Sequence, residues 1–427
     1  MKRAVILATF GVALVGCGGN DNSFSNAGAG LYGTPARDAR ERDNLVNNAT
    51  KELAKGPAGK VAEASGTFGT KMLNALDSEA NVVISPLSIS SALSMTLNGA
   101  AGSTQLEMLD ALGFDKLTPM QVNEASRSMR TLLGNVDPTV ELRVANSIWA
   151  KEGQPFKPEF LTLNESAYGA KTTQLDFADP ATPDTINRWV KEATNSKIDK
   201  IVDQIGKDSV MFLINAVYFK GQWRTPFVKS ATKDGSFTTA KGDKRSVPMM
   251  SNTASFGYAE DKGWKALAMP YGNGRIEMLV VLPTGGLDGM VKNFAEKGWP
   301  KGLANLTEQQ VGVKFPKFRL EYSETLNDSL KALGIKKAFT DQADFSGMSL
   351  DRLLISNVKH KTFIEVDEVG TEAAAATSVE MAVTSAPIDK PKEFVADKPF
   401  LFVIREKQTG VVLFTGAIRS VGEAQKP

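Results

Sequence analysis

Few side chains in this 427-residue chain have the chemistry of a catalytic or metal site. The chain contains one histidine, His360, and one cysteine, Cys17. These counts exclude a disulfide framework or a His/Cys metal cluster within the chain. His360 could be the base of a Ser-His-Asp triad, but its neighbours are apolar and basic and no catalytic motif surrounds it. We therefore expect a structural histidine, no metal, no cofactor and no enzymatic activity.

The most unusual segment is 365–386, between two apolar runs near the C-terminus. Alternate residues from Thr371 onward are small or apolar: Thr371, Ala373, Ala375, Thr377, Val379 and Met381. The residues between them include both charges: Glu372, Ala374, Ala376, Ser378 and Glu380. This alternation is typical of a strand with one buried face, although Ala favours helices. The segment could thus be helical or exposed in one state and a strand in another, with Gly370 as a hinge that reaches unusual dihedral angles.

The composition indicates a large folded protein rather than a nucleic-acid binder. The chain is 42% hydrophobic, enough for a large core in one big domain or two. Its net charge is +2 and it has no long run of Lys or Arg, which argues against nucleic acid as the main partner. Helical patterns come first and many strand patterns follow, so the expected fold class is α+β.

Hydrophobic periodicity and breaker residues predict the individual elements. Helices are expected at 39–53, 62–76, 185–194 and 323–333, and another begins at Pro86. Strands are expected at 82–84, 145–149, 174–177, 210–219, 277–282, 312–320, 400–405 and 411–415. The last two form a C-terminal hairpin. Segment 210–219 is apolar on both faces except at Asn215, which indicates a central buried strand, and Gly221 is expected to end it.

The N-terminus is typical of a targeting segment. Residues 1–16 carry two basic residues, Lys2 and Arg3, near their start and continue as an apolar run that is too short to span a membrane. The run ends Leu14-Val15-Gly16-Cys17, which resembles a bacterial lipoprotein cleavage box. The resemblance implies that Cys17 becomes the first mature residue and carries lipid; the alternative is an ordinary signal peptide with an incidental cysteine. Residues 17–59 then read as a flexible tether. We expect a protein of the bacterial cell envelope, anchored to a membrane, or an extracellular one.

Five motifs occur in the order found in the serpin family, and together they resemble it closely. They are N-V-V-I-S-P-L-S-I at Asn81, N-A-V-Y-F-K-G-Q-W at Asn215, K-F-P-K-F at Lys314, E-V-G-T-E-A-A-A-A-T at Glu368 and K-P-F-L-F-V-I-R at Lys398. The resemblance covers residues 60–421 and leaves a short tail at 422–427. It implies a large central mixed sheet, two smaller sheets, about eight or nine helices and an exposed reactive-centre loop near the C-terminus.

The resemblance also implies suicide inhibition of a serine protease. The protease would attack the loop and form a covalent acyl complex, after which the loop would insert into the central sheet and trap it. The matching hinge residues are Glu368, Gly370, Thr371, Glu372, Ala373, Ala374, Ala375 and Ala376. The residues that match the family's shutter, where the central sheet must part, are Ser85, Ser88, Asn215 and His360. Trp223 matches the breach tryptophan, where the loop enters.

The scissile bond and the target are less sharply defined. Counting from Glu368 by the family's usual spacing gives Thr384–Ser385, with Met381–Ala382 and Val383–Thr384 as alternatives. These residues are small or apolar, which favours elastase-like or subtilisin-like proteases over trypsin-like ones. Three alternatives remain: a non-inhibitory serpin, an inhibitor of cysteine proteases, and a hydrolase. The hydrolase has no recognisable nucleophile motif in its favour. The small residues at 371 and 373–376 favour inhibition. We expect a monomer whose partners are the protease and, through Cys17, a membrane.

The cleavage box generates a first prediction. Replacing Cys17 with Ala should move the protein from the membrane fraction to the soluble fraction, because stable anchoring needs two lipid chains or more and none could then attach. Fractionation, together with the mass of the mature N-terminus, tests this. Unchanged fractionation and an N-terminus without lipid mass would contradict it.

Overall fold

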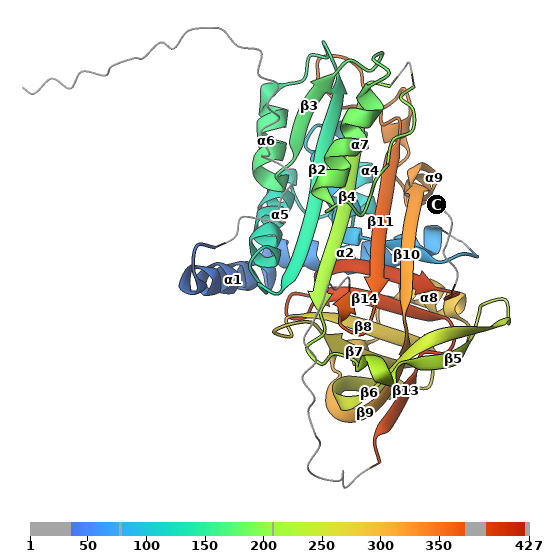
Figure 1. Cartoon of the computed structure of the whole chain (residues 1–427). Helices are drawn as coiled ribbons and strands as arrows, with labels where there is room; N and C mark the ends of the chain where they lie inside the picture. Colours follow the sequence, from blue (N-terminus) through green and yellow to red (C-terminus); the bar gives the residue numbers. More distant parts are fainter. Residues whose placement is uncertain (1–35, 77–78, 207–208, 372–389, 423–427) are drawn as a thin grey trace, which may run out of the picture.

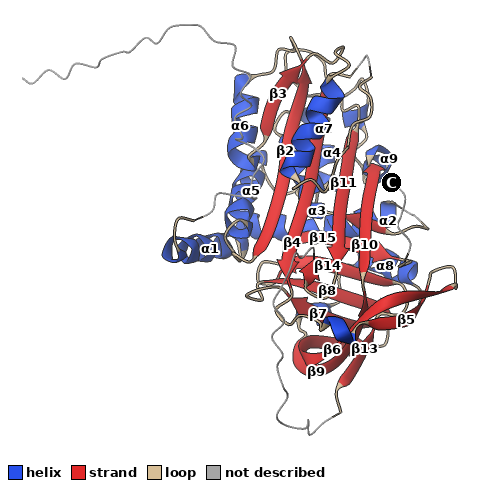
Figure 2. Ribbon diagram, viewed as in Figure 1, coloured by secondary structure: helices blue, strands red, loops and turns tan. Residues whose placement is uncertain are grey.

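The computed structural model describes residues 36–76, 79–206, 209–371 and 390–422 (Figure 1). Several residues singled out above lie outside these ranges: Cys17, the hinge residues 372–376 and the candidate bond residues 381–385. The description below therefore concerns the body of the protein and the first residues of the loop. The fold is α+β, with helices packed against two large sheets (Figure 2).

The first sheet has six strands and is mixed. Its order is β10 (Phe318–Thr325), β11 (Val358–Val366), β12 (Gly370–Thr371), β4 (Met211–Gln222), β2 (Val140–Lys151) and β3 (Lys171–Leu175). β4 is nearly fully buried along its length, as its apolar sequence predicts. It does not end at Gly221, because Gly221 pairs with Val140 on one side and with Thr371 on the other.

The second sheet has nine strands. Its main path is β1 (Val82–Ile84), β15 (Val412–Ile418), β14 (Phe400–Glu406), β8 (Ile276–Pro283), β7 (Trp264–Pro270), β6 (Lys244–Asp261), β9 (Thr307–Pro316) and β13 (Lys392–Val395), and β5 (Lys233–Thr238) pairs with β6. The two smaller sheets expected from the sequence are hydrogen-bonded into one, because the 18-residue strand β6 runs through both. The predicted hairpin of β14 and β15 is present.

Nine α-helices lie within the described part of the chain. They are α1 (Ala39–Leu53), α2 (Gly56–Ala75), α3 (Pro86–Leu97), α4 (Gly102–Ala111), α5 (Pro119–Leu133), α6 (Pro158–Tyr168), α7 (Thr182–Ala193), α8 (Leu287–Lys297) and α9 (Asn327–Ala332). α3 is wholly buried and packs against both β4 and β15, so it connects the two sheets. α7 covers the six-stranded sheet, where Trp189 meets Trp149 of β2 edge to face at 5.6 Å.

Two predicted elements differ in the structure. The expected strand 312–320 is two strands, β9 and β10, because the chain leaves one sheet and enters the other at Lys317. The helix expected at 323–333 begins only at Asn327, because residues up to Thr325 are paired with β11.

The helix predicted at 39–53 is present as α1, but it is not part of a flexible tether. Val46, Ala49 and Leu53 are buried where α1 packs against α5 and α2. The next helix, α2, already begins at Gly56. The folded body therefore begins ahead of residue 60. None of the helices described is long and apolar enough to cross a bilayer.

Candidate functional site

The site lies on the seam between β11 and β4 in the six-stranded sheet. The two strands run parallel and pair directly from Val358 opposite Leu213 to Thr362 opposite Val217. Further along they separate, and the short strand β12 pairs with both of them. Thr371 pairs with Val366 of β11 on one side and with Gly221 of β4 on the other. The seam is thus closed at one end and holds the start of an additional antiparallel strand at the other.

Gly370 allows this close approach. A Cβ atom at this position would lie 2.0 Å from the carbonyl oxygen of Gly221 and 2.8 Å from the Cα of Gln222. Its φ is outside the left-handed region, so the hinge does not depend on unusual dihedral angles. In this state the requirement for glycine is therefore steric rather than conformational.

Thr371 is fully buried, and its hydroxyl lies 2.6 Å from the hydroxyl of Tyr271. The Tyr271 ring stacks on Trp223, with centroids 4.4 Å apart, and meets Phe219 edge to face at 5.2 Å. Burial raises the pKa of Tyr271, although the contact with Thr371 opposes this, so its hydroxyl stays protonated. These aromatic rings form the wall against which the first loop residue packs.

The turn that leads from β11 into β12 is fixed by hydrogen bonds. The Asp367 carboxylate accepts the backbone N–H groups of Val369, at 2.8 Å, and Gly370, at 3.1 Å. Trp223 donates its indole N–H to the Asp367 carbonyl, at 2.9 Å, and its backbone N–H to the Val369 carbonyl, at 2.8 Å. Trp223 therefore bonds directly to the turn that leads into β12.

Glu368, at the tip of this turn, has a buried carboxylate with two partners. It accepts hydrogen bonds from Lys317 Nζ at 2.7 Å and from Thr232 Oγ1 at 2.8 Å. Burial alone would raise the pKa of Glu368, but these hydrogen bonds outweigh burial and lower the pKa below its ordinary value. Glu368 is therefore ionised at neutral pH and anchors the turn to the segment between β9 and β10.

The residues expected to form the shutter lie where β11 and β4 still pair. His360 is buried and its Nε2 accepts the backbone N–H of Ser85 at 3.1 Å. Burial lowers the pKa of His360 to about 3, so the ring is neutral at physiological pH. Ser85 caps α3 by accepting the N–H of Ser88, and Asn215 is opposite His360 in the strand register. The structure thus brings together His360, Ser85 and Ser88, and places Asn215 beside them.

This environment fits a structural histidine. Its Nε2 accepts a hydrogen bond from a backbone amide, that of Ser85, whereas a triad base is oriented by a carboxylate. The Ser88 hydroxyl is buried and has no hydrogen-bond partner within these ranges. An unsatisfied buried hydroxyl is costly, so this part of the seam is not optimally paired.

Three residues of the site were not identified from the sequence. Tyr271, Lys317 and Thr232 contact the hinge across large sequence separations, and no motif assigned them a role. One signal was available for Lys317, which is a charge between apolar residues in the motif that begins at Lys314. Tyr271 and Thr232 have no such signal.

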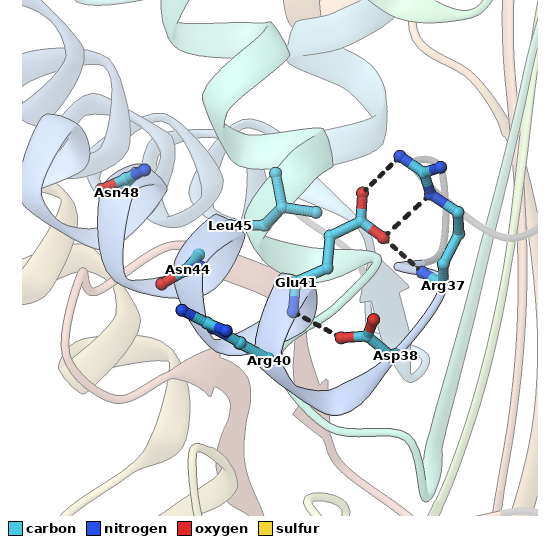
Figure 3. A pocket seen from close by; sticks show the side chains of 7 residues that line it. All are labelled: Arg37, Asp38, Arg40, Glu41, Asn44, Leu45 and Asn48. Carbon is cyan, nitrogen blue, oxygen red and sulfur yellow. Dashed lines mark hydrogen bonds and ion pairs between the residues drawn. The ribbon is translucent and has the colours of Figure 1, made fainter.

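A shallow pocket on α1 is not a candidate site. It is lined by Arg37, Asp38, Arg40, Glu41, Asn44, Leu45 and Asn48, all from one helix and the residues just before it (Figure 3). Arg37 is paired with Glu41 at 3.4 Å, and Asp38 accepts the Glu41 N–H at 2.9 Å. These charges neutralise one another locally, and nothing points toward a ligand.

The buried carboxylate of Glu368 generates a second prediction. The pKa of Glu368 is lower in the folded protein than the unfolded value of about 4.3. The ionised carboxylate therefore stabilises the folded protein above about pH 4.3, and this stabilisation is lost as the pH falls through the folded-state pKa. Glu368→Gln should therefore lower the free energy of unfolding by about 1.5–3 kcal/mol at pH 7. Urea unfolding at pH 7 and at about pH 4 measures this.

The exposed Glu393 of β13 provides the matched control for this prediction. Glu393→Gln should leave the unfolding midpoint almost unchanged at both pH values. The difference between Glu368→Gln and the wild type should shrink in acid. A difference that stays constant or grows in acid would contradict the assigned ion pair.

Comparison with known proteins agrees with this architecture. Residues 63–421 match the family described as "Serpin (serine protease inhibitor)". The chain is 38% identical over 366 residues to the leukocyte elastase inhibitor of Sus scrofa, covering 82% of this chain and 96% of that one. An uncharacterized serpin-like protein of Thermococcus kodakarensis is 34% identical over 422 residues, covering 97% and 98%. The crystal structure of tengpin, a thermophilic serpin in the native state, has a TM-score of 0.77 at 31% identity, covering 92% of this chain and all of that one. The chain belongs to the serpin family.

Proposed function

We propose that the protein inhibits a serine protease as a suicide substrate. The observation that carries this proposal is β12, which already stands between β11 and β4 as the beginning of an additional strand. A loop that has begun to enter the sheet needs only to continue in the same register. The small side chain of Thr371 fits the inhibitory alternative better than a non-inhibitory one.

The covalent step takes place on the loop between residues 372 and 390. The serine hydroxyl of the protease attacks a loop carbonyl carbon while a histidine of the protease takes the hydroxyl proton. The peptide bond then breaks, the new amine takes that proton, and the loop is left as an ester on the protease serine. Thr384–Ser385 is the proposed bond, with Met381–Ala382 and Val383–Thr384 as alternatives.

The strand register specifies how insertion would proceed. If β12 continued in its present pairing, residue 375 would lie between Thr362 and Val217, the first pair of the closed seam. Residue 377 would then lie between His360 and Asn215. Insertion must therefore separate His360 from Asn215. It would replace the hydrogen-bond ladder between β11 and β4 by two ladders, one on each side of the inserted strand. A strand from 371 to 384 would span roughly 46 Å at about 3.3 Å per residue, which carries the bound protease a long way.

The proposed target is an elastase-like or subtilisin-like protease. The candidate residues at 381–385 are small or apolar and suit shallow apolar pockets. The pig relative at 38% identity is named as an inhibitor of leukocyte elastase, which supports the same class here. Inhibition of a cysteine protease through the same loop is the second candidate.

We also propose that the protein acts as a monomer at the bacterial cell envelope, held to a membrane by lipid on Cys17. The support is the sequence Leu14 to Cys17, which resembles a lipoprotein cleavage box. Anchoring would restrict the inhibitor to proteases that reach the same surface.

The proposed function generates a third prediction. Mixed with pancreatic elastase, the protein should form a covalent complex that survives boiling in SDS and has the mass of protease plus inhibitor minus the C-terminal fragment. Elastase whose serine has first been blocked should give no complex. Complete cleavage without any complex would contradict inhibition.

Loop cleavage should also change stability. Protein cleaved in the loop should melt at a higher temperature than intact protein, whereas an ordinary nicked loop gains no stability.

The burial of Thr371 generates a fourth prediction. Thr371→Arg would place an unpaired charge beside Tyr271 and between two strands, which is strongly unfavourable. The hinge should then stay out of the sheet, insertion should slow, and water should hydrolyse the ester first. The number of inhibitor molecules consumed per protease inactivated should rise at least several-fold, with a similar rate of loop cleavage.

Glu372→Arg is the matched control for this prediction, because the sequence alternation predicts the opposite, wetter face for residue 372. It should change the number of molecules consumed only slightly. Equal behaviour of the two variants would show that the alternation does not describe the inserted strand.

A further inference from the structure

The turn between β7 and β8 connects the hinge to a helix in a different part of the molecule. We call residues 271–276 the connecting turn. Two backbone hydrogen bonds fix it internally. The Tyr271 N–H donates to the Ile276 carbonyl at 2.8 Å, and the Gly274 N–H donates to the Tyr271 carbonyl at 2.7 Å. In addition, the Asn273 side chain accepts the N–H of Arg275 at 2.9 Å. These hydrogen bonds tie the two ends of the turn together.

One end of the connecting turn contacts the hinge. Tyr271 bonds to the hydroxyl of Thr371 and stacks on Trp223. The next residue, Gly272, donates its N–H to the Gln222 carbonyl at 2.9 Å, at the point where Gln222 pairs with Gly370. The position of this turn therefore determines the position of the wall against which β12 packs.

The other end contacts α1. Arg275 donates from Nη2 to Thr50 Oγ1 at 3.1 Å and from Nε to the Glu406 carboxylate at 2.7 Å. Glu406 is fully buried, so the guanidinium is held in place by its charge. The Thr50 hydroxyl donates to the Val46 carbonyl, which leaves its lone pairs for Arg275. Arg275 thus joins α1 to the connecting turn.

A second set of contacts joins the same two parts. The backbone N–H of Ala36, just before α1, donates to the Asn135 side chain at 2.7 Å. In the same segment, the Val136 carbonyl accepts the Asn273 side chain at 2.8 Å, and the Asp137 carboxylate accepts the Asn273 N–H at 2.7 Å. Two independent routes therefore run from the α1 region to the connecting turn.

We propose that Arg275 and Thr50 are positioning residues for the reactive loop, through which α1 holds Thr371 between β11 and β4. α1 lies ahead of residues 63–421, which match the family. The inference rests on the proposed function, because its consequence is the speed of insertion after the ester forms. With α1 docked, the first step of insertion has already taken place before cleavage. Without its contact to Arg275, the hinge leaves the sheet more often and more ester is hydrolysed.

Thr50→Val tests the proposal, because it keeps the shape of the side chain and removes only the oxygen that Arg275 contacts. Hydrogen exchange of a peptide covering 366–371, measured by mass spectrometry without protease, should become several-fold faster. The number of inhibitor molecules consumed per elastase inactivated should rise at least twofold. Thr50→Ser keeps the oxygen and should restore both values. Asn47→Ala, on the exposed face of α1, is the matched control and should change neither.

A double-mutant cycle with Tyr271→Phe identifies the route. If α1 acts through the Tyr271 hydroxyl, Thr50→Val should add little to the exchange rate once that hydroxyl is removed. If Thr50→Val lowers the melting temperature but leaves exchange at 366–371 at the wild-type rate, α1 only contributes packing and the proposal is wrong. If exchange responds but no variant, nor the wild type, forms a complex with a protease, the coupling holds and the proposed inhibition fails.

Discussion

The incomplete pairing between β11 and β4 is the constraint on which the rest of the site depends. Two parallel strands that pair at one end and separate at the other leave backbone groups that only a further strand can satisfy, and buried backbone groups must be satisfied. Gly370 and Thr371 meet this need for one short stretch. Two aromatic residues, Trp223 and Tyr271, fix them from one side, and two residues of the preceding turn, Asp367 and Glu368, fix them from the other. In the proposed mechanism, this unfinished pairing stores the folding energy that insertion would release.

The two ends of the seam are held by different physical means. At the entrance, an ionised carboxylate and a lysine fix the turn, so this end is sensitive to charge and to acid. At the closed end, a neutral histidine accepts a backbone amide in a nearly dry environment, so this end is insensitive to charge over the physiological range. The contact made by Glu368 therefore depends on charge, whereas the contact made by His360 does not.

Much of this arrangement could be predicted from the sequence, and the part that could not has a clear physical reason. Local signals were sufficient for the buried strand β4, the proline at the start of α3 and the C-terminal hairpin, because each depends on neighbouring residues. The contacts Tyr271–Thr371 and Thr232–Glu368 join residues 100 and 136 positions apart, and neither pair has a sequence pattern of its own. The space required around Gly370 is set by a carbonyl of β4, so the sequence could show the glycine but not the reason for it. The composition of residues 36–59 indicated a tether because the apolar residues of α1 are few, yet they are enough to dock it.

The position of β13 bears on whether cutting the loop can be reversed. After the loop ends, the chain pairs with β9 through β13 and continues into β14, which lies between β8 and β15 inside the nine-stranded sheet. Cleavage would produce a C-terminal fragment that stays bound in the sheet, so its new amino group would not diffuse away. Chemically, such a retained amine could attack the ester and restore the original bond. In the proposed mechanism only distance prevents this religation, because insertion carries the ester to the far end of the other sheet. The permanence of inhibition would then come from geometry rather than from loss of the leaving group.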